Sequence, residues 1–113
     1  MTRIRINIGE VTVVAALNES NTARLVHEAL PFDGSAQRWG DEVYFEIPVK
    51  TGQEDPQPEV PGGTVAYWPP GSALCLFFGQ KPYSPVNVIG TIEGDPNVLA
   101  AVADGQPARV EEA

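Results

Sequence analysis

The stretch Tyr67-Trp68-Pro69-Pro70-Gly71-Ser72-Ala73-Leu74-Cys75-Leu76-Phe77-Phe78-Gly79 decides the fold class of this chain. Two runs rich in apolar and aromatic residues, Thr64–Trp68 and 73–78, lie on either side of a Pro-Pro-Gly-Ser sequence. Pro69 pushes Trp68 into an extended backbone, and neither a helix nor a central strand can continue through two prolines. The pattern therefore predicts two short strands joined by a tight turn.

Towards the N-terminus, apolar and polar residues alternate in the runs Arg3–Ile8 and Val11–Leu17, with Gly9 and Glu10 between them. A period of two residues is typical of half-buried strands, so these runs predict a hairpin.

After the second of these runs the period of the apolar residues changes. Ser20-Asn21-Thr22 supplies helix-capping residues, an apolar stripe of helical period follows, and Pro31 stops it. We expect one main helix there.

The remainder of the chain again favours strands. We expect them at residues 35–39, 42–47 and 86–92, with a last edge strand at 108–110. The polar, proline-rich segment 50–63 is the longest expected loop, and a short second helical segment should begin at Asp95-Pro96 and end at Gly105. The total is about eight short strands, which is typical of a mostly β barrel or sandwich.

Composition fits one such domain, residues 1–113, because 11 Gly and 11 Pro suit many tight turns and not long helices. A net charge of −8 with only 7 Lys and Arg argues against nucleic acid or an anionic membrane as partner. The N-terminus lacks the apolar stretch of a signal peptide, and no run spans a bilayer. Since Cys75 is the single cysteine, we expect a cytoplasmic protein.

Few residues carry recognisable chemistry. One His and one Cys make a zinc site improbable, and neither a phosphate-binding glycine loop nor a nucleophile elbow is present, so we expect no metal and no cofactor. A carboxylate site for a hard cation would need Asp41, Glu42 and Glu46. Cys75 lies mid-strand between leucines, which favours an inert core thiol, and His27 next to Glu28 favours a solvent-facing ring.

Aromatic residues are the most informative feature. They cluster in the middle and later chain: Phe32, Trp39, Tyr44, Phe45, Tyr67, Trp68, Phe77, Phe78 and Tyr83. Alternation along a strand puts Tyr44 and Phe45 on opposite faces, and Phe77 and Phe78 likewise. About half of these rings can therefore face the core. The others either lie under the long loop or form a cleft for an extended peptide or a small apolar ligand.

Three motifs resemble a known family. Trp39-Gly40-Asp41-Glu42-Val43-Tyr44-Phe45, the stretch from Tyr67 to Gly79, and Val86-Asn87-Val88-Ile89-Gly90 are similar to a prokaryotic family of short cyclophilin-like proteins of unknown function, and Ala29-Leu30-Pro31-Phe32 fits as well. The resemblance covers nearly the whole chain. It implies a closed eight-stranded cyclophilin-like barrel capped by a helix, in agreement with the strand pattern.

Cyclophilins proper are peptidyl-prolyl isomerases, and the resemblance to their site is partial. Arg38 stands where it resembles their catalytic arginine, and Phe77-Phe78 resembles the aromatic pair of their pocket strand. The Gln-Gly-Gly segment and the later pocket Trp and His have no counterpart. Alternation also puts Arg38 and Trp39 on opposite faces of their strand, so both do not easily line one pocket.

Three hypotheses follow. The first is a binding module, not an enzyme, in which Trp39, Tyr44, Trp68 and Phe77 wall a cleft for a small molecule or an extended peptide. The second is a divergent prolyl isomerase that uses Arg38 and Phe77 on a proline-containing peptide. The third is an oligomer in which the outward aromatic rings form a subunit interface.

Overall fold

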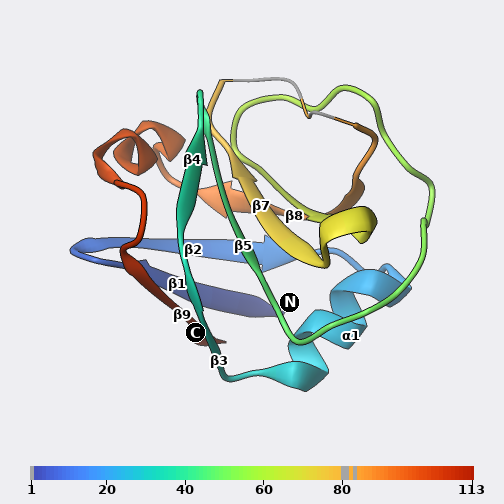
Figure 1. Ribbon diagram of the computed structural model, residues 1–113. Helices are drawn as coiled ribbons and strands as arrows, with labels where there is room; N and C mark the ends of the chain where they lie inside the picture. The colour runs from blue at the N-terminus through green and yellow to red at the C-terminus, as the bar shows by residue number, and fades with distance from the viewer. Residues whose placement is uncertain (1, 80–81, 83) are drawn as a thin grey trace.

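The computed structural model describes residues 2–79, 82 and 84–113, and the chain forms a β-barrel with helical segments at its margins (Figure 1). The strands are β1 (Arg3–Ile8), β2 (Val11–Leu17), β3 (Phe32–Ser35), β4 (Gln37–Trp39), β5 (Glu42–Glu46), β6 (Thr64–Trp68), β7 (Ala73–Phe77), β8 (Asn87–Glu93) and β9 (Pro107–Glu112). The helical segments are α1 (Asn21–Ala29) and two 3-10 turns, η1 (Pro69–Gly71) and η2 (Pro96–Ala101). The predicted mostly β class, main helix and short second helical segment are confirmed.

All strand pairs are antiparallel, in the order β3-β9-β1-β2-β8-β6-β7-β5-β4. The two end strands, β3 and β4, are separated only by Ala36. The continuous segment 32–39 therefore pairs with β9 through its first half and with β5 through its second half, and so closes the barrel. Counted as one bent strand, this segment gives the eight predicted strands; the break at Ala36 makes nine.

The sequence predicted an edge strand at residues 108–110, and this prediction is wrong. β9 is longer than predicted and lies between β1 and β3, paired with both. Its alternate residues Ala108 and Val110 are buried in the barrel. The short apolar pattern of this segment resembles that of an edge strand. The prediction was wrong because this pattern does not contain the bend at Ala36, which brings β3 alongside β9.

The barrel interior holds the main core. It contains one face of each strand except β4, with Ile4, Ile6 and Ile8 from β1 and Val43 from β5 fully buried, and Phe45 from β5 nearly so. Helix α1 begins after Ser20, whose Oγ accepts a hydrogen bond from the backbone N–H of Ala23 at 3.1 Å, and ends before Pro31 as predicted. The helix adds the buried side chains of Ala23 and Val26 to this core.

The long loop between β5 and β6 is tied to the barrel by polar contacts. Asn87, which is 1% exposed, accepts a hydrogen bond from the backbone N–H of Glu54 at 2.9 Å and donates to the Gly52 carbonyl at 3.0 Å. The Glu54 carboxylate in turn accepts from the Thr22 hydroxyl at 2.6 Å and from the backbone N–H groups of Thr22 and Asn21 at the start of α1. These hydrogen bonds lower the pKa of Glu54 and join the loop, β8 and α1 into one unit.

Within the described residues, no helix is both long enough and apolar enough to cross a membrane.

Candidate functional site

The outer face of β4, β5 and β7 carries aromatic side chains in register. Trp39 on β4 lies opposite Glu42 on β5, and Glu42 lies opposite Phe77 on β7. One row along, Tyr44 lies opposite Cys75. Because cross-strand partners point to the same side of a sheet, these side chains share the face that is turned away from the barrel interior.

A second apolar cluster lies on this outer face. Its buried members are Ala66, Ala73, Cys75, Phe77 and Val86, and Tyr44, Val60 and Trp68 pack against them. Three of the buried members, Ala66, Ala73 and Cys75, are small. Small side chains in the middle of a ring of large ones leave a hollow.

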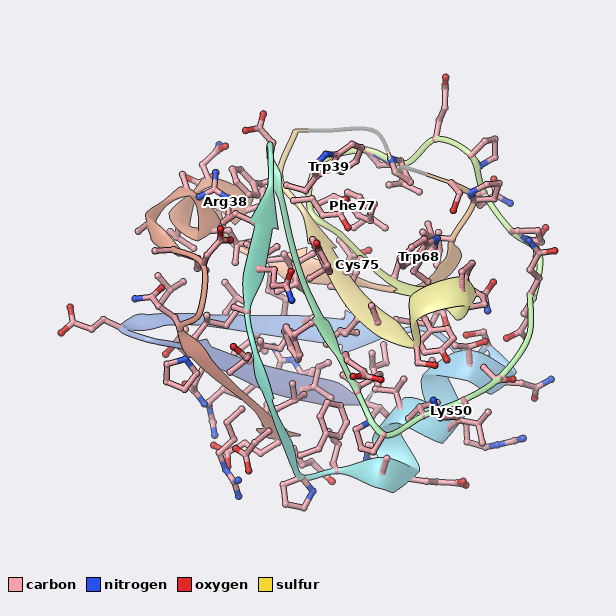
Figure 2. The ribbon with its side chains drawn as sticks, in the orientation of Figure 1. Arg38, Trp39, Lys50, Trp68, Cys75 and Phe77 are labelled. Atoms are coloured by element: carbon pink, nitrogen blue, oxygen red, sulfur yellow. The ribbon has the colours of Figure 1, made fainter. Side chains whose placement is uncertain are left out.

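That hollow is a pocket of about 210 Å³. Its lining includes Trp39, Tyr44, Trp68 and Phe77, the four residues that the sequence singled out. Pro82, Ser84 and Val86, which precede β8, also line it. Figure 2 shows Trp39, Phe77, Cys75 and Trp68 following one another along the β7 side of the molecule. Phe77 is fully buried, whereas Trp39 is 43% exposed and so lies where solvent reaches the pocket.

The position of the Trp68 ring has two local causes. Its indole Nε1 donates a hydrogen bond to the Ser84 hydroxyl, which joins the end of β6 to the segment before β8. Its other edge lies over Gly71 of the Pro-Pro-Gly turn, where an added Cβ would come within 2.6 Å of Trp68 Cε3. The turn therefore needs glycine at Gly71 for the ring to form this wall.

Glu42 supplies the carboxyl group among the described residues that line the pocket, and it is only 6% exposed. Burial disfavours the carboxylate and raises the pKa of Glu42 to about 7, while a hydrogen bond with the Cys75 thiol acts in the opposite direction. The pKa of the Cys75 thiol is also raised well above its usual range. The larger cause is burial, which disfavours the thiolate, and the second cause is the neighbouring Glu42 carboxyl group. The thiol is therefore protonated and unreactive at neutral pH.

Arg38 lies on the other side of β4, towards η2 (Figure 2). Its guanidinium donates to the backbone carbonyls of Gly40, Ala100 and Val102 at 2.9–3.2 Å, and it stacks 5.1 Å from the centre of the Phe78 ring. It is not among the described residues that line the pocket. The structure thus brings the four aromatic candidates together and holds Arg38 apart from them.

The remaining candidates lie elsewhere. Glu46 is exposed two residues beyond Tyr44, and the Asp41 carboxylate is directed towards Gly79, so the three carboxylates considered for a hard cation do not converge. No group of three potential metal ligands occurs in the described part of the chain. His27 Nε2 lies 3.3 Å from Glu112 on β9. Tyr83 lies outside the described residues.

Sequence reasoning missed Glu42 as a pocket residue. A signal was available, because alternation puts Glu42 on the same face as Tyr44, next to the turn that follows Trp39. Glu46, on the same face, is exposed. Only the segments that pack over Glu42 make it a buried group.

A family model described as Cyclophilin-like matches residues 2–111. The chain belongs to the cyclophilin-like family. A solved structure, that of the hypothetical protein AF2241 from Archaeoglobus fulgidus, is 40% identical, with a TM-score of 0.85 over 99% of this chain and 95% of that one. The structure of McbB in complex with tryptophan is similar in fold, with a TM-score of 0.77 and 19% identity. This chain covers 44% of McbB, which in turn matches 96% of this chain. No curated protein matches.

Membership of this family confirms the cyclophilin-like barrel that the sequence motifs indicated. Fold alone does not assign an activity, because one barrel architecture carries many functions. The function must therefore be argued from the pocket.

Proposed function

We propose that this protein is a binding module whose outer-face pocket holds a small molecule or a single side chain with a flat apolar group. The observation that carries the proposal is the convergence of Trp39, Tyr44, Trp68 and Phe77 on one pocket. Aromatic walls offer large apolar contact area and stacking geometry to a flat group. Concave apolar sites with few polar groups are the usual form of small-molecule sites.

Pocket size favours the small molecule over an extended peptide. The volume of about 210 Å³ is below the ~300 Å³ at which pockets for drug-sized ligands begin. It suits one ring system. Trp68 is held by Ser84 and Gly71, so the wall is formed before a ligand arrives and little ordering cost opposes binding.

The two tryptophans of the chain both line the pocket, which gives a direct test. We expect 2-phenylethanol to cause saturable shifts of both indole N–H resonances in ¹H–¹⁵N NMR spectra. Trp39→Ala should weaken this binding roughly tenfold, as removal of an aromatic anchor does. Val98→Ala is the matched control, because Val98 is similarly exposed, at 45%, but lies on η2. Absence of a saturable shift with 2-phenylethanol and also with its amine analogue 2-phenylethylamine would show the proposal to be wrong.

The exposure of Trp39 also keeps the subunit-interface hypothesis open as a second candidate, since an exposed ring beside an apolar pocket can contact another copy. In that case light scattering should show an oligomer at high concentration, and Trp39→Ala should dissociate it. A monomer at every concentration would remove this candidate and leave the pocket open to small molecules.

A further inference from the structure

The chemistry around Glu42 indicates which ligands the pocket prefers. The Glu42 carboxyl group extends from β5. It faces Trp39 of β4 on one side, and Phe77 and the Cys75 thiol of β7 on the other. Tyr44 on its own strand and Ser84 complete the polar lining. No Lys or Arg is among the described lining residues. Of the other charged residues of the β4–β5 hairpin, Arg38 donates to backbone carbonyls, the Asp41 carboxylate is directed towards Gly79, and Glu46 is exposed.

We propose that the pocket selects ligands that carry a protonated amine on an aromatic or similarly flat body, with the ammonium group placed against the Glu42 carboxylate between the Trp39 and Phe77 rings. This inference rests on the proposed function and adds the ligand class to it. Carboxylates accept short, charge-assisted hydrogen bonds from ammonium groups. The faces of Trp, Tyr and Phe rings attract cations, and more strongly where water is excluded.

Electrostatics exclude the opposite ligand class. An anion would have to enter a pocket that contains a carboxyl group, and no lining cation in the described chain compensates for it. The net charge of −8 also raises the local concentration of cations and repels anions at a distance. A neutral ligand gains the ring contacts but leaves the carboxyl without a charged partner.

Ligand binding should be coupled to loss of a proton from Glu42. In the empty pocket the pKa of Glu42 is about 7, and an adjacent ammonium group stabilises the carboxylate and lowers that value. Below pH 7 the amine must therefore displace a proton, so its affinity rises with pH and becomes constant above that value. For a pKa of about 7, the dissociation constant at about pH 8.5 should be roughly 30-fold smaller than at about pH 5.5.

The test compares three probes of matched shape by NMR titration across this pH range: 2-phenylethylamine, the neutral 2-phenylethanol and the anionic phenylacetate. We expect the amine to bind most tightly at about pH 8, with the stated pH dependence. Glu42→Gln should weaken amine binding roughly ten- to hundredfold and abolish its pH dependence. The same variant should change 2-phenylethanol binding far less than amine binding, which separates loss of charge from loss of pocket shape.

Glu46→Gln is the matched control, because Glu46 lies on the same strand and the same outward face but is exposed and does not line the pocket. Its amine binding should equal that of the native protein. If 2-phenylethanol or phenylacetate binds as tightly as the amine above pH 7, the ligand class is wrong while the binding module stands. If none of the probes binds, the binding module itself is wrong.

Discussion

Glu42 and Cys75 show at the scale of single residues how an outward position can be buried. Both point away from the barrel interior, yet Glu42 is 6% and Cys75 is 2% exposed, because aromatic neighbours and the segment before β8 cover them. A buried carboxyl has to be protonated, paired or stabilised by hydrogen bonds. The raised pKa of Glu42 indicates that this carboxyl group responds to burial by keeping its proton.

This raised pKa makes stability depend on pH. Between the ordinary value of 4.5 and about 7, folded Glu42 holds a proton that the unfolded chain releases. The folded state therefore loses stability as pH rises through this window, and the full cost remains above it. Glu42→Gln should remove this cost and raise the free energy of unfolding at about pH 8 by on the order of 1–3 kcal/mol.

Urea unfolding of both proteins from pH 4 to 8 measures this effect. The difference between the two profiles is the relevant quantity, because Glu54 and Glu93, whose pKa values are lowered, contribute the opposite slope to both proteins at acid pH. We expect the difference to grow from about pH 4.5 to about pH 7 and then to remain constant. A constant difference over the whole range would contradict the assignment of the shift to Glu42.

Arg38 is expected to act through structure. Its side chain joins β4 to the end of η2 through the carbonyls of Ala100 and Val102 and covers one face of Phe78. Arg38→Ala leaves these carbonyls without a donor and should lower the free energy of unfolding by roughly 1–3 kcal/mol. Arg38→Lys should recover only part of this loss, because an ammonium group cannot reproduce the planar array of donors.

The Arg38→Ala variant also tests the isomerase hypothesis, which stays a prediction. A coupled assay on a proline tetrapeptide should show activity in the native protein that is lost in Arg38→Ala if Arg38 is catalytic. Equal background rates in the two proteins, together with the expected loss of stability, would limit Arg38 to its structural contacts.

At the scale of elements, the turn η1 connects the sequence motif to the pocket. Pro69 and Pro70 form the 3-10 turn, Ser72 follows in a left-handed conformation with a φ of 49°, and Gly71 lies beneath the Trp68 ring. The turn thus joins β6 to β7 and also sets the orientation of one pocket wall.

Gly71→Ala should displace that wall. The new Cβ would come within 2.6 Å of the ring, and Ser84 holds the indole from the other side, so the ring cannot move without loss of that hydrogen bond. We expect a changed Trp68 indole resonance, weaker 2-phenylethanol binding and a destabilisation of roughly 1–3 kcal/mol. Gly52→Ala is the control, because a Cβ there meets nothing within 4 Å. Unchanged binding in Gly71→Ala would show that Trp68 does not wall the pocket.

At the scale of the whole molecule, two apolar clusters share the same strands. Strands β5, β6 and β7 contribute Phe45, Tyr67 and Leu74 to the inner core, and Tyr44, Ala66 and Cys75 to the outer cluster. Loss of pairing in these strands therefore disrupts both clusters at once. The segment 32–39 couples the remaining strands, because it completes the barrel on both of its sides.

Unfolding should accordingly be a single cooperative transition, as the assignment of residues 1–113 to one domain predicts. Tryptophan fluorescence reports on the outer pocket, and far-ultraviolet circular dichroism reports on the whole barrel. We expect the two urea curves to coincide. An earlier fluorescence transition would show that the outer cluster unfolds separately from the barrel.

The sequence by itself determined the elements and the relative orientation of their side chains. Period-two alternation placed β1 and β2 correctly, the capping residues and Pro31 bounded α1, and the Pro-Pro-Gly turn separated β6 from β7. Alternation also separated Phe77 from Phe78, which lie against the outer and inner clusters respectively. These features are local, because backbone geometry relates neighbouring residues whatever surrounds them.

Only the tertiary structure decided how these elements close and what they bury. The break at Ala36, the position of β9 between β1 and β3, and the cover over Glu42 all depend on segments distant in sequence. Alternation states which residues share a face, but it does not state whether that face meets solvent. The burial of Glu42, its raised pKa and its place in the pocket follow from packing between distant segments, which no local pattern contains.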